Sequence, residues 1–309
     1  MSAKKNILFI VNPISGTGKQ KQLDKLLANN LDKSKFDYSI VFTESGGHAT
    51  DLAKSGIDDN DIIVAVGGDG TVNEVARGLV NSNRIMGILP VGSGNGLARH
   101  LKLSMRLSES IKILNKLDIE TIDTADINGE YFVNVAGIGF DAHVAHLYAK
   151  TVKRGPIPYA KLMTMEFQKY KPIPYKVLIE GKSYDLSAFL ISFANSSQFG
   201  NNAYISPQAI INDGLIDVCM MTGFPIVEAG QLAMQLFNKR MDKSKYMNIV
   251  QGANITIEAE NDIIGHIDGE PVNFSNKIEV RVNPASLKVI HNPNSNKMQL
   301  PNFKDLLKG

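Results

Sequence analysis

The stretch VAVGGDGTVNEVARGL, residues 64–79, decides the fold because it joins the end of a buried strand to a glycine run and an amphipathic helix. Residues 62–66 are all apolar and predict a fully buried strand. The apolar residues after the glycines recur at helical spacing, as Val72, Val75, Ala76, Leu79 and Val80. Gly67, Gly68 and Gly70 therefore lie at the N-terminus of a helix, where backbone N–H groups and the helix dipole suit a phosphate group.

A purely structural interpretation of this turn stays open, because Thr71 and Glu74 have the spacing of a capping box. Two better-known phosphate motifs are excluded. A Walker A loop needs Gly where Pro13 stands and Ser or Thr where Gln20 stands. The other G-x-G pairs of the chain are not followed by the third glycine of a dinucleotide fingerprint.

The composition is that of an ordinary globular protein, with 43% hydrophobic and 21% charged residues in 309. The formal charge of +2, without any block of like charge, gives no reason to expect a nucleic-acid partner. The single cysteine, Cys219, excludes an internal disulfide and fits a reducing compartment. His48 and His266 lack the spacing of metal ligands, and we interpret them as structural. The first apolar run is too short for a signal peptide or a membrane span, so we expect a cytoplasmic protein.

Four strands alternate with helices in the first part of the chain. The strands are expected at residues 6–11, 38–42, 62–66 and 85–89, and a polar, glycine-rich segment follows each of them. This alternation predicts a parallel sheet with right-handed crossovers, in which ligands bind beyond the carboxyl ends of the strands. All four glycine-rich segments fall at those ends, so they converge on one crevice and favour phosphate or nucleotide binding.

The second part of the chain has short strands with turn signals, which predicts an antiparallel sheet domain. The expected strands are residues 119–127, 131–136, 176–179, 188–194, 215–221, 255–258, 277–282 and 287–290. Two helices, expected at residues 159–170 and 226–239, interrupt them. We divide the chain into an α/β domain at residues 1–122 and a β domain at residues 123–290, with the tail 291–309 packing back on the first.

Three carboxylates in the second domain are candidates for a metal-binding, catalytic or ligand-binding role, and each also has a structural interpretation. Asp213 can hold a hard cation together with nearby carbonyl groups, although an Asx turn is the simpler interpretation. Asp268-Gly269 has the chemistry of a type I′ turn and delivers Glu270 at the mouth of a hairpin, where a structural glutamate is the simpler interpretation. Asp141, after the sequence GIGF, either meets a ligand or caps the helix that follows.

Taken together, these segments resemble the diacylglycerol kinase and sphingosine kinase superfamily of lipid kinases. Five family motifs occur in the family order, as NPISGTGK at 12–19, GGDGTVNEV at 67–75, PVGSGN at 90–95, DGLID at 213–217 and DGE at 268–270. The resemblance runs from residue 5 to about residue 290. NAD kinases and phosphofructokinases share the GGDGT element, whereas GSGN with DGxLD and DGE is specific to the lipid kinases.

The resemblance implies the fold class α/β plus β: a phosphofructokinase/NAD-kinase-like α/β domain with a parallel sheet, then an antiparallel β-sandwich, with ATP in the cleft between them. By position, the family's nucleotide contacts fall on Asn12, Lys19, Thr43, Gly67, Gly68, Asp69, Gly70, Thr71, Val72, Asn73, Ser93 and Asn95. The magnesium-binding turn of the family matches Asp213 with the carbonyl groups of Ile210 and Leu215. Glu270 matches the general base, Asp69 is a second catalytic carboxylate, and Asp141 is a candidate for binding the lipid substrate.

Two departures from the family pattern leave the acceptor lipid open. Gly96 stands where the bacterial diacylglycerol kinases have an acidic residue, and residues 198–202 replace a run of glycines. The expected partner is a membrane lipid, reached by transient contact with the membrane surface, and a homodimer is possible. Residues 150–159 combine basic and apolar side chains and are our candidate for that contact, with a solvated loop as the alternative.

Two other functions compete with an ATP-dependent lipid kinase. An NAD kinase shares the GGDGT loop but is expected to have a different glycine motif after it. A nucleotide-gated lipid-binding protein without catalysis is the non-enzymatic alternative. The presence of Asp69, Asp213 and Glu270 together argues against it.

Overall fold

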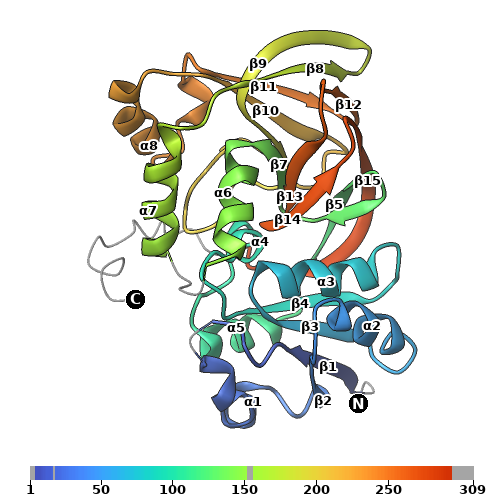
Figure 1. Ribbon diagram of the computed structural model, residues 1–309. Coiled ribbons are helices and arrows are strands. Elements are labelled where there is room, and N and C mark those ends of the chain that lie inside the picture. The colour runs from blue at the N-terminus through green and yellow to red at the C-terminus, as the bar shows by residue number, and fades with distance from the viewer. Residues whose placement is uncertain (1–3, 17, 152–155, 294–309) are drawn as a thin grey trace.

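The computed structural model describes residues 4–16, 18–151 and 156–293, and Figure 1 shows two domains, one above the other. The lower, N-terminal domain is built on four parallel strands in the order β2–β1–β3–β4. These strands are β1 (Lys5–Val11), β2 (Phe36–Phe42), β3 (Ile62–Gly67) and β4 (Ile85–Pro90). The register pairs Val11 with Phe42 and Gly67 with Pro90, so the carboxyl ends of all four strands lie at one edge of the sheet.

Helices cover this parallel sheet. They are α1 (Leu23–Asn30), which follows the short 3₁₀ helix η1 (Lys19–Gln22), then α2 (His48–Ser55), α3 (Asp69–Leu79), α4 (Gly96–His100) and α5 (Leu107–Leu114). Helices α2 and α3 pack against each other, as do α1 and α5 (Figure 1). The predicted apolar face of α3 is confirmed, because Val72, Val75, Ala76 and Leu79 are all buried.

The capping-box interpretation at the start of α3 is wrong. The helix begins at Asp69, earlier than the capping box requires. Glu74 instead accepts hydrogen bonds from the N–H groups of Gly47, at 2.9 Å, and Ala49, at 3.1 Å. It thereby satisfies N-terminal donors of α2, a neighbour in space rather than in sequence.

The second domain is a set of mostly antiparallel strands. Its strands are β5 (Ile119–Ile127), β6 (Glu130–Phe132), β7 (Val135–Gly139), β8 (Ile173–Ile179), β9 (Lys182–Ala194), β10 (Ile216–Thr222), β11 (Met247–Gly252), β12 (Asn254–Glu258), β13 (Ile263–Ile267), β14 (Glu270–Phe274) and β15 (Lys277–Ile290). Side chains from β5, β8, β9, β12 and β13, among others, form one apolar core. The predicted fold class, a parallel α/β domain followed by an antiparallel β-sandwich, is therefore confirmed.

Three helices cover one side of the second domain at the left of Figure 1. They are α6 (Phe140–Ala149), α7 (Pro156–Phe167) and α8 (Ala229–Phe237), and short 3₁₀ turns η2 (Ile226–Glu228) and η3 (Met241–Lys243) flank the last. An aromatic cluster anchors them on the sheet, with the rings of Phe140 and Phe189 stacked 4.5 Å apart between centroids. No helix formed by the described residues is long and apolar enough to cross a membrane.

Strand β15 belongs to both domains. Its first part pairs antiparallel with β12, most of its length pairs antiparallel with β5, and its end pairs in parallel with β4, where Lys288 lies opposite Ile85. The two strands expected at 277–282 and 287–290 are therefore one strand, with an irregularity between Asn283 and Leu287. Leu287, Val289 and Ile290 lie in the core of the first domain, so this strand carries apolar packing across the boundary.

The single strand expected at 131–136 is instead two strands, β6 and β7, that pair with different partners. The reason is a carboxylate: the N–H groups of Val133, Asn134 and Val135 all donate to Asp268 rather than to a neighbouring strand. At the other end of the chain, His291 and Asn292 donate backbone N–H groups to Asp118 and Leu101 of the first domain. The rest of the tail predicted to pack there, residues 294–309, lies outside the described residues.

Candidate active site

Three loops of the first domain meet at the carboxyl edge of its sheet. The amide of Asn12 donates to the hydroxyl of Thr71 at 3.2 Å, and the N–H of Val91 donates to the carbonyl of Gly67 at 3.0 Å. The backbones of Gly68 and Gly92 are in close contact, and a Cβ on Gly92 would stand 2.5 Å from Cα of Gly68. Of the four glycine-rich segments predicted to converge, these contacts bring together the three that follow β1, β3 and β4, and glycine is required where two of the loops touch.

Asp69 holds the GSGN loop in place. Its two carboxylate oxygens accept hydrogen bonds from the N–H groups of Asn95, at 2.8 Å, and Gly96, at 2.7 Å. Burial raises the pKa of Asp69 to about 6, while these two donors act in the opposite direction. The carboxylate thus fixes a loop, and its predicted part in catalysis stays a prediction.

Gly96 lies where the second domain presses on the first. A Cβ at this position would stand 2.3 Å from Nδ2 of Asn134 and 2.8 Å from the carbonyl oxygen of Phe199. The acidic residue that the bacterial diacylglycerol kinases have here would collide with both. Nearby, the ring of His100 accepts a hydrogen bond from the N–H of Ser197 at 3.1 Å, which closes the junction further.

One face of α3 contacts the second domain along its whole length, through Gly70, Asn73 and Arg77. The amide of Asn73 donates to Asp268 at 2.8 Å and to the carbonyl of Tyr131 at 3.0 Å. Asn73, expected as a nucleotide contact, therefore ties the two domains together with its amide. Arg77 forms an ion pair with Glu130 at 2.5 Å.

Asp268 is the most fully bonded carboxylate of the site. Besides Asn73 it accepts three backbone N–H groups, from Val133, Asn134 and Val135, at 2.9–3.0 Å. Asp268 and Gly269 have φ angles of 48° and 90°, as a type I′ turn requires, so the predicted hairpin turn is confirmed. Four donors on one buried side chain leave this turn little freedom.

The turn directs Glu270 toward the start of α3. A Cβ on Gly70 would stand 2.9 Å from Oε1 of Glu270, so the carboxylate occupies the space that a side chain there would take. Within the described part of the chain, no lysine, arginine or histidine forms an ion pair with Glu270, whereas Glu130 has Arg77. An exposed, unneutralised carboxylate thus faces the helix N-terminus where phosphate is expected.

Asp141, which is partly buried, and His266, which is buried, form a pair behind this turn. Nε2 of His266 lies 3.1 Å from Asp141, the hydroxyl of Ser192 donates to the same carboxylate oxygen at 3.1 Å, and the N–H of Gly269 donates to Nδ1 of His266 at 3.4 Å. His266 is thus structural, as predicted, and it also connects Asp141 to the turn that carries Glu270.

Asp213 forms the Asx turn that the sequence suggested. Its carboxylate accepts the N–H of Leu215 at 3.1 Å, and the buried Asp123 accepts the N–H of Gly214 at 2.7 Å. Ile210 is 56% exposed beside it. Among the residues that the structure describes, no three His, Cys, Asp or Glu side chains gather closely enough to hold a metal ion. An exposed carboxylate with nearby carbonyl groups still offers the oxygen ligands that Mg²⁺ prefers.

The remaining predicted contacts lie at the same edge of the sheet. Thr43 donates its N–H to Val11 at 2.9 Å, and Ser93 is exposed on the GSGN loop. Val72 is buried in the core, so its side chain contributes packing. The side chain of Lys19 lies outside the described part of the structure.

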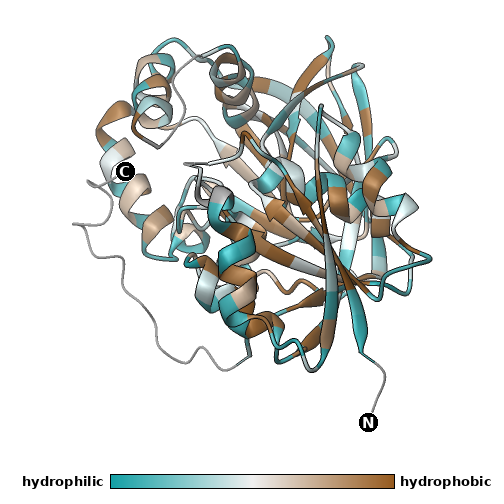
Figure 2. Ribbon diagram, turned by 90° about the horizontal axis from the view of Figure 1, so that it is seen from below, coloured by the Kyte–Doolittle hydropathy of each residue, from teal (hydrophilic) through white to brown (hydrophobic). Residues whose placement is uncertain are grey.

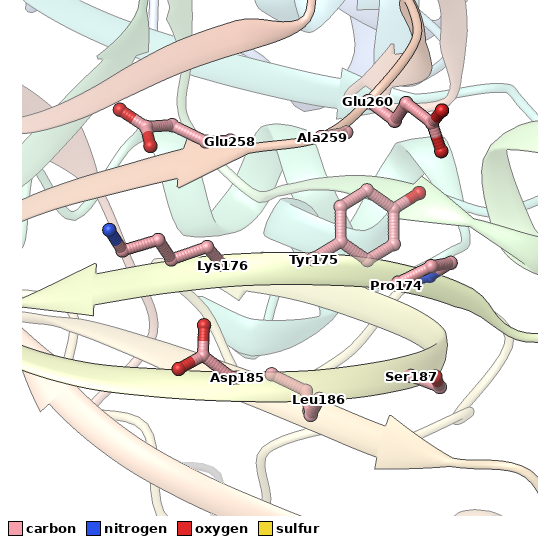
Figure 3. Close-up of a pocket in the computed structure, with 9 residues that line it drawn as sticks. All are labelled: Pro174, Tyr175, Lys176, Asp185, Leu186, Ser187, Glu258, Ala259 and Glu260. Atoms are coloured by element: carbon pink, nitrogen blue, oxygen red, sulfur yellow. The ribbon is translucent and has the colours of Figure 1, made fainter.

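A separate cavity of about 530 Å³ lies over β8, β9 and β12 (Figure 3). Across it Lys176 stands between Asp185 and Glu258, its neighbours on the two adjacent strands. None of the predicted site residues lines this cavity. The chemistry predicted from the sequence therefore belongs to the junction of the domains and not to this surface.

Two family models match the chain. The diacylglycerol kinase catalytic domain matches residues 6–127, and the YegS C-terminal NAD kinase beta sandwich-like domain matches residues 134–291. "Probable lipid kinase YegS" of Escherichia fergusonii is 30% identical over 235 residues, which cover 73% of this chain and 76% of that protein. "Probable lipid kinase YegS-like" of Chromohalobacter salexigens is 26% identical over 280 residues, or 87% of this chain and 89% of that protein.

Solved structures agree on the fold. A crystal structure titled as a diacylglycerol kinase from Bacillus anthracis superposes with a TM-score of 0.74 at 22% identity. The superposition covers 95% of this chain and 99% of that one. The two-domain arrangement is thus shared with a known architecture.

Proposed function

Because the chain belongs to the diacylglycerol kinase-like lipid kinases, which are phosphotransferases, we propose that it transfers the γ-phosphate of ATP to a hydroxyl group of a membrane lipid. The acceptor class that we propose is diacylglycerol, a related glycerolipid or a long-chain base, with Mg²⁺ as the metal. We further propose that the protein works in the cytoplasm and meets the membrane only transiently.

One observation carries the proposal: the carboxylate of Glu270 faces Gly70 at the N-terminus of α3, across the junction between the domains. A helix N-terminus with glycines offers N–H groups to a phosphate, and a carboxylate opposite it can accept a proton from a hydroxyl group. These are two of the parts that phosphoryl transfer needs, and they come from different domains.

The chain's own residues have separable tasks in this scheme. Asp69 and the glycine contacts between Gly68 and Gly92 hold the nucleotide loops rigid, so that little reorganisation is needed when phosphate binds. Asp268 and Asn73 fix the distance between α3 and the Glu270 turn. Glu270 accepts the proton of the lipid hydroxyl as the new P–O bond forms and the bond between the γ-phosphate and the departing ADP breaks.

The metal is assigned to the Asx turn of Asp213. Its carboxylate, with the carbonyl groups of Ile210 and Leu215, makes a hard oxygen donor set that fits Mg²⁺ in type. Mg²⁺ supplies positive charge against the charge that develops on the transferred phosphoryl group. In our proposal the contribution of this turn is to organise the metal, while the proton transfer belongs to Glu270.

The test is to incubate the protein with γ-labelled ATP, Mg²⁺ and a total lipid extract, and to identify the labelled product. The Glu270→Gln variant and an incubation with NAD in place of lipid run in parallel. A labelled lipid formed by the wild type only supports the proposal. Label on NAD would make the protein an NAD kinase, and ATP binding without any labelled product would favour a nucleotide-gated lipid-binding protein.

A further inference from the structure

Large apolar side chains are exposed along α8 and the turn η2 that precedes it. The exposed fractions are 56% for Ile226, 86% for Val227, 65% for Met234 and 52% for Phe237. Figure 2 shows brown, hydrophobic segments on the helices at the left margin, where α7 and α8 lie in both views. Soluble proteins seldom leave several large apolar side chains together in water unless the surface has a partner.

These side chains occupy one face of the helix. Ile226, Met234 and Phe237, with Gly230 between them, follow the three- to four-residue spacing of a single helix face. The opposite face of α8 is apolar as well, and there Leu232 is buried while Leu236 packs against the aromatic core. The helix therefore has two apolar faces, and only the inner one is covered by the described residues.

Basic residues border the outer face. Residues 225–246 contain four basic residues, Lys239, Arg240, Lys243 and Lys245, against two acidic ones, Glu228 and Asp242, a net charge of +2. A cavity of about 200 Å³ on the flank of α8 is lined in part by Glu228, Lys243 and Lys245. Lys243 pairs with Asp242 and Lys245 with Glu228, each at 3.1 Å, so the net charge of this segment falls on the other two basic residues. Lys239 and Arg240 are exposed just beyond the end of the helix.

We propose that the outer face of α8, with η2, docks on an anionic membrane surface. Ile226, Val227, Met234 and Phe237 enter the boundary between headgroups and acyl chains, and the basic border contacts anionic headgroups. The charge favours this occupant over a second copy of the chain, because two such faces meeting would bring both basic borders together. This surface would supply the membrane contact of the proposed lipid kinase, and its role therefore rests on the proposed function.

This surface is connected to the predicted acceptor site through the layer of helices on the second domain. Helix α7 packs on α6, whose first turn contains Asp141, and α7 and α8 share the same aromatic core. The segment predicted for membrane contact, residues 150–159, includes residues 152–155, which lie outside the described residues. Of its described part, Tyr159 packs edge-to-face on Tyr148, with ring centroids 5.1 Å apart, so its ring serves packing. Helix α8 is therefore the better-supported docking element.

The test measures binding to vesicles without ATP and without any acceptor lipid. Wild-type protein is sedimented with vesicles of phosphatidylcholine alone or of phosphatidylcholine with one third phosphatidylglycerol. We expect binding to the anionic vesicles only, weakened by added salt. Phe237→Ser should reduce the partition coefficient about tenfold. Lys239→Gln with Arg240→Gln should reduce it about twenty-fivefold, since each basic residue near such a surface is worth about fivefold.

Phe42→Ser is the matched control, because Phe42 is 56% exposed on the edge strand of the first domain. The proposal is overturned if Phe42→Ser and Phe237→Ser weaken vesicle binding equally. It is overturned as well if the wild-type protein does not bind anionic vesicles. It is also overturned if Phe237→Ser converts a dimer to a monomer in sedimentation velocity and leaves vesicle binding unchanged. Phosphorylation of a short-chain, water-soluble diacylglycerol should be unaffected by Phe237→Ser, so loss of docking and loss of kinase activity are distinguishable.

Discussion

Two hairpins of the second domain contain nearly the same local chemistry and end beside the same helix. The Glu130 hairpin, residues 126–130 (DINGE), has Asn128 and Gly129 at φ angles of 52° and 89°. The Glu270 hairpin, residues 266–270 (HIDGE), has Asp268 and Gly269 at 48° and 90°. In both, the residue after the turn is a glutamate that reaches α3.

The surroundings of the two turns differ. Glu130 meets Arg77 and is neutralised, and its turn residue Asn128 bonds to the neighbouring strand at Glu279. Glu270 instead faces Gly70 at the positive end of α3, and its turn residue Asp268 is buried under four donors. The same turn therefore provides a surface ion pair in one place and a candidate base in the other, and only the tertiary partners distinguish them.

The two hairpins should differ most when the charge is removed from each glutamate in turn. Glu270→Gln keeps shape and hydrogen bonding but cannot accept a proton, so turnover should fall at least about a hundredfold with ATP affinity unchanged. Glu130→Gln loses only an exposed ion pair, worth at most about 1 kcal/mol, and should keep full turnover. Steady-state kinetics on both variants decide the matter. If Glu270→Gln retains more than a tenth of wild-type turnover, Glu270 is not the base.

A second experiment exchanges the turn residues. Asp268→Asn makes the Glu270 hairpin chemically like its counterpart, but its amide NH₂ would face two N–H donors, so the free energy of unfolding should drop by about 2–5 kcal/mol. Asn128→Asp, at an exposed turn, should change it by less than about 0.5 kcal/mol. Urea unfolding followed by circular dichroism measures both. Equal effects of the two substitutions would show that burial of Asp268 does not matter.

The third prediction concerns the junction that the Glu270 hairpin occupies. Burial lowers the pKa of His100 to about 4, below its ordinary value near 6.5, so the folded protein keeps this ring neutral. The unfolded chain then binds the proton first as the pH falls, and the protein loses about 2 kcal/mol of stability between pH 6.5 and 5. His100→Gln, which has no proton to bind, should lack this loss. The free energy of unfolding of the wild type and of His100→Gln is measured over that pH range. An equal loss in both proteins would contradict the prediction.

The smallest expected effect tests the contact between Glu270 and α3. Gly70→Ala places a Cβ 2.9 Å from Oε1 of Glu270, closer than a normal contact, so the flexible carboxylate must move aside and turnover should fall about tenfold with the fold intact. Arg77→Ala removes the corresponding contact of Glu130 and should leave turnover unchanged. The pair is compared by turnover at saturating ATP, with thermal unfolding as a check on folding. Unchanged turnover in Gly70→Ala would place the working position of Glu270 elsewhere.

Most of the fold could be predicted from local sequence patterns, because strands, helices and turns depend on the periodicity and type of neighbouring residues. The alternation of buried strands and glycine-rich turns predicted the parallel sheet, and the positive φ angles of Asp268 and Gly269 follow directly from their residue types. The site was harder to predict. Asn73 and Glu74 look alike as polar residues of one helix, yet Asn73 binds Asp268 of the other domain and Glu74 caps a neighbouring helix. Such partners lie far away in sequence, so no local spacing reveals them.

Strand β15 has a mechanical consequence for the whole molecule. Since it is hydrogen-bonded to β4 at one end and to β5 and β12 along the rest, the domains share a backbone ladder instead of a flexible linker. Pulling them apart would require breaking that ladder, so we expect heating to melt both domains in a single calorimetric transition. To admit the substrate, the loops at the junction would then have to move, because the two domains could not rotate about a hinge as rigid bodies.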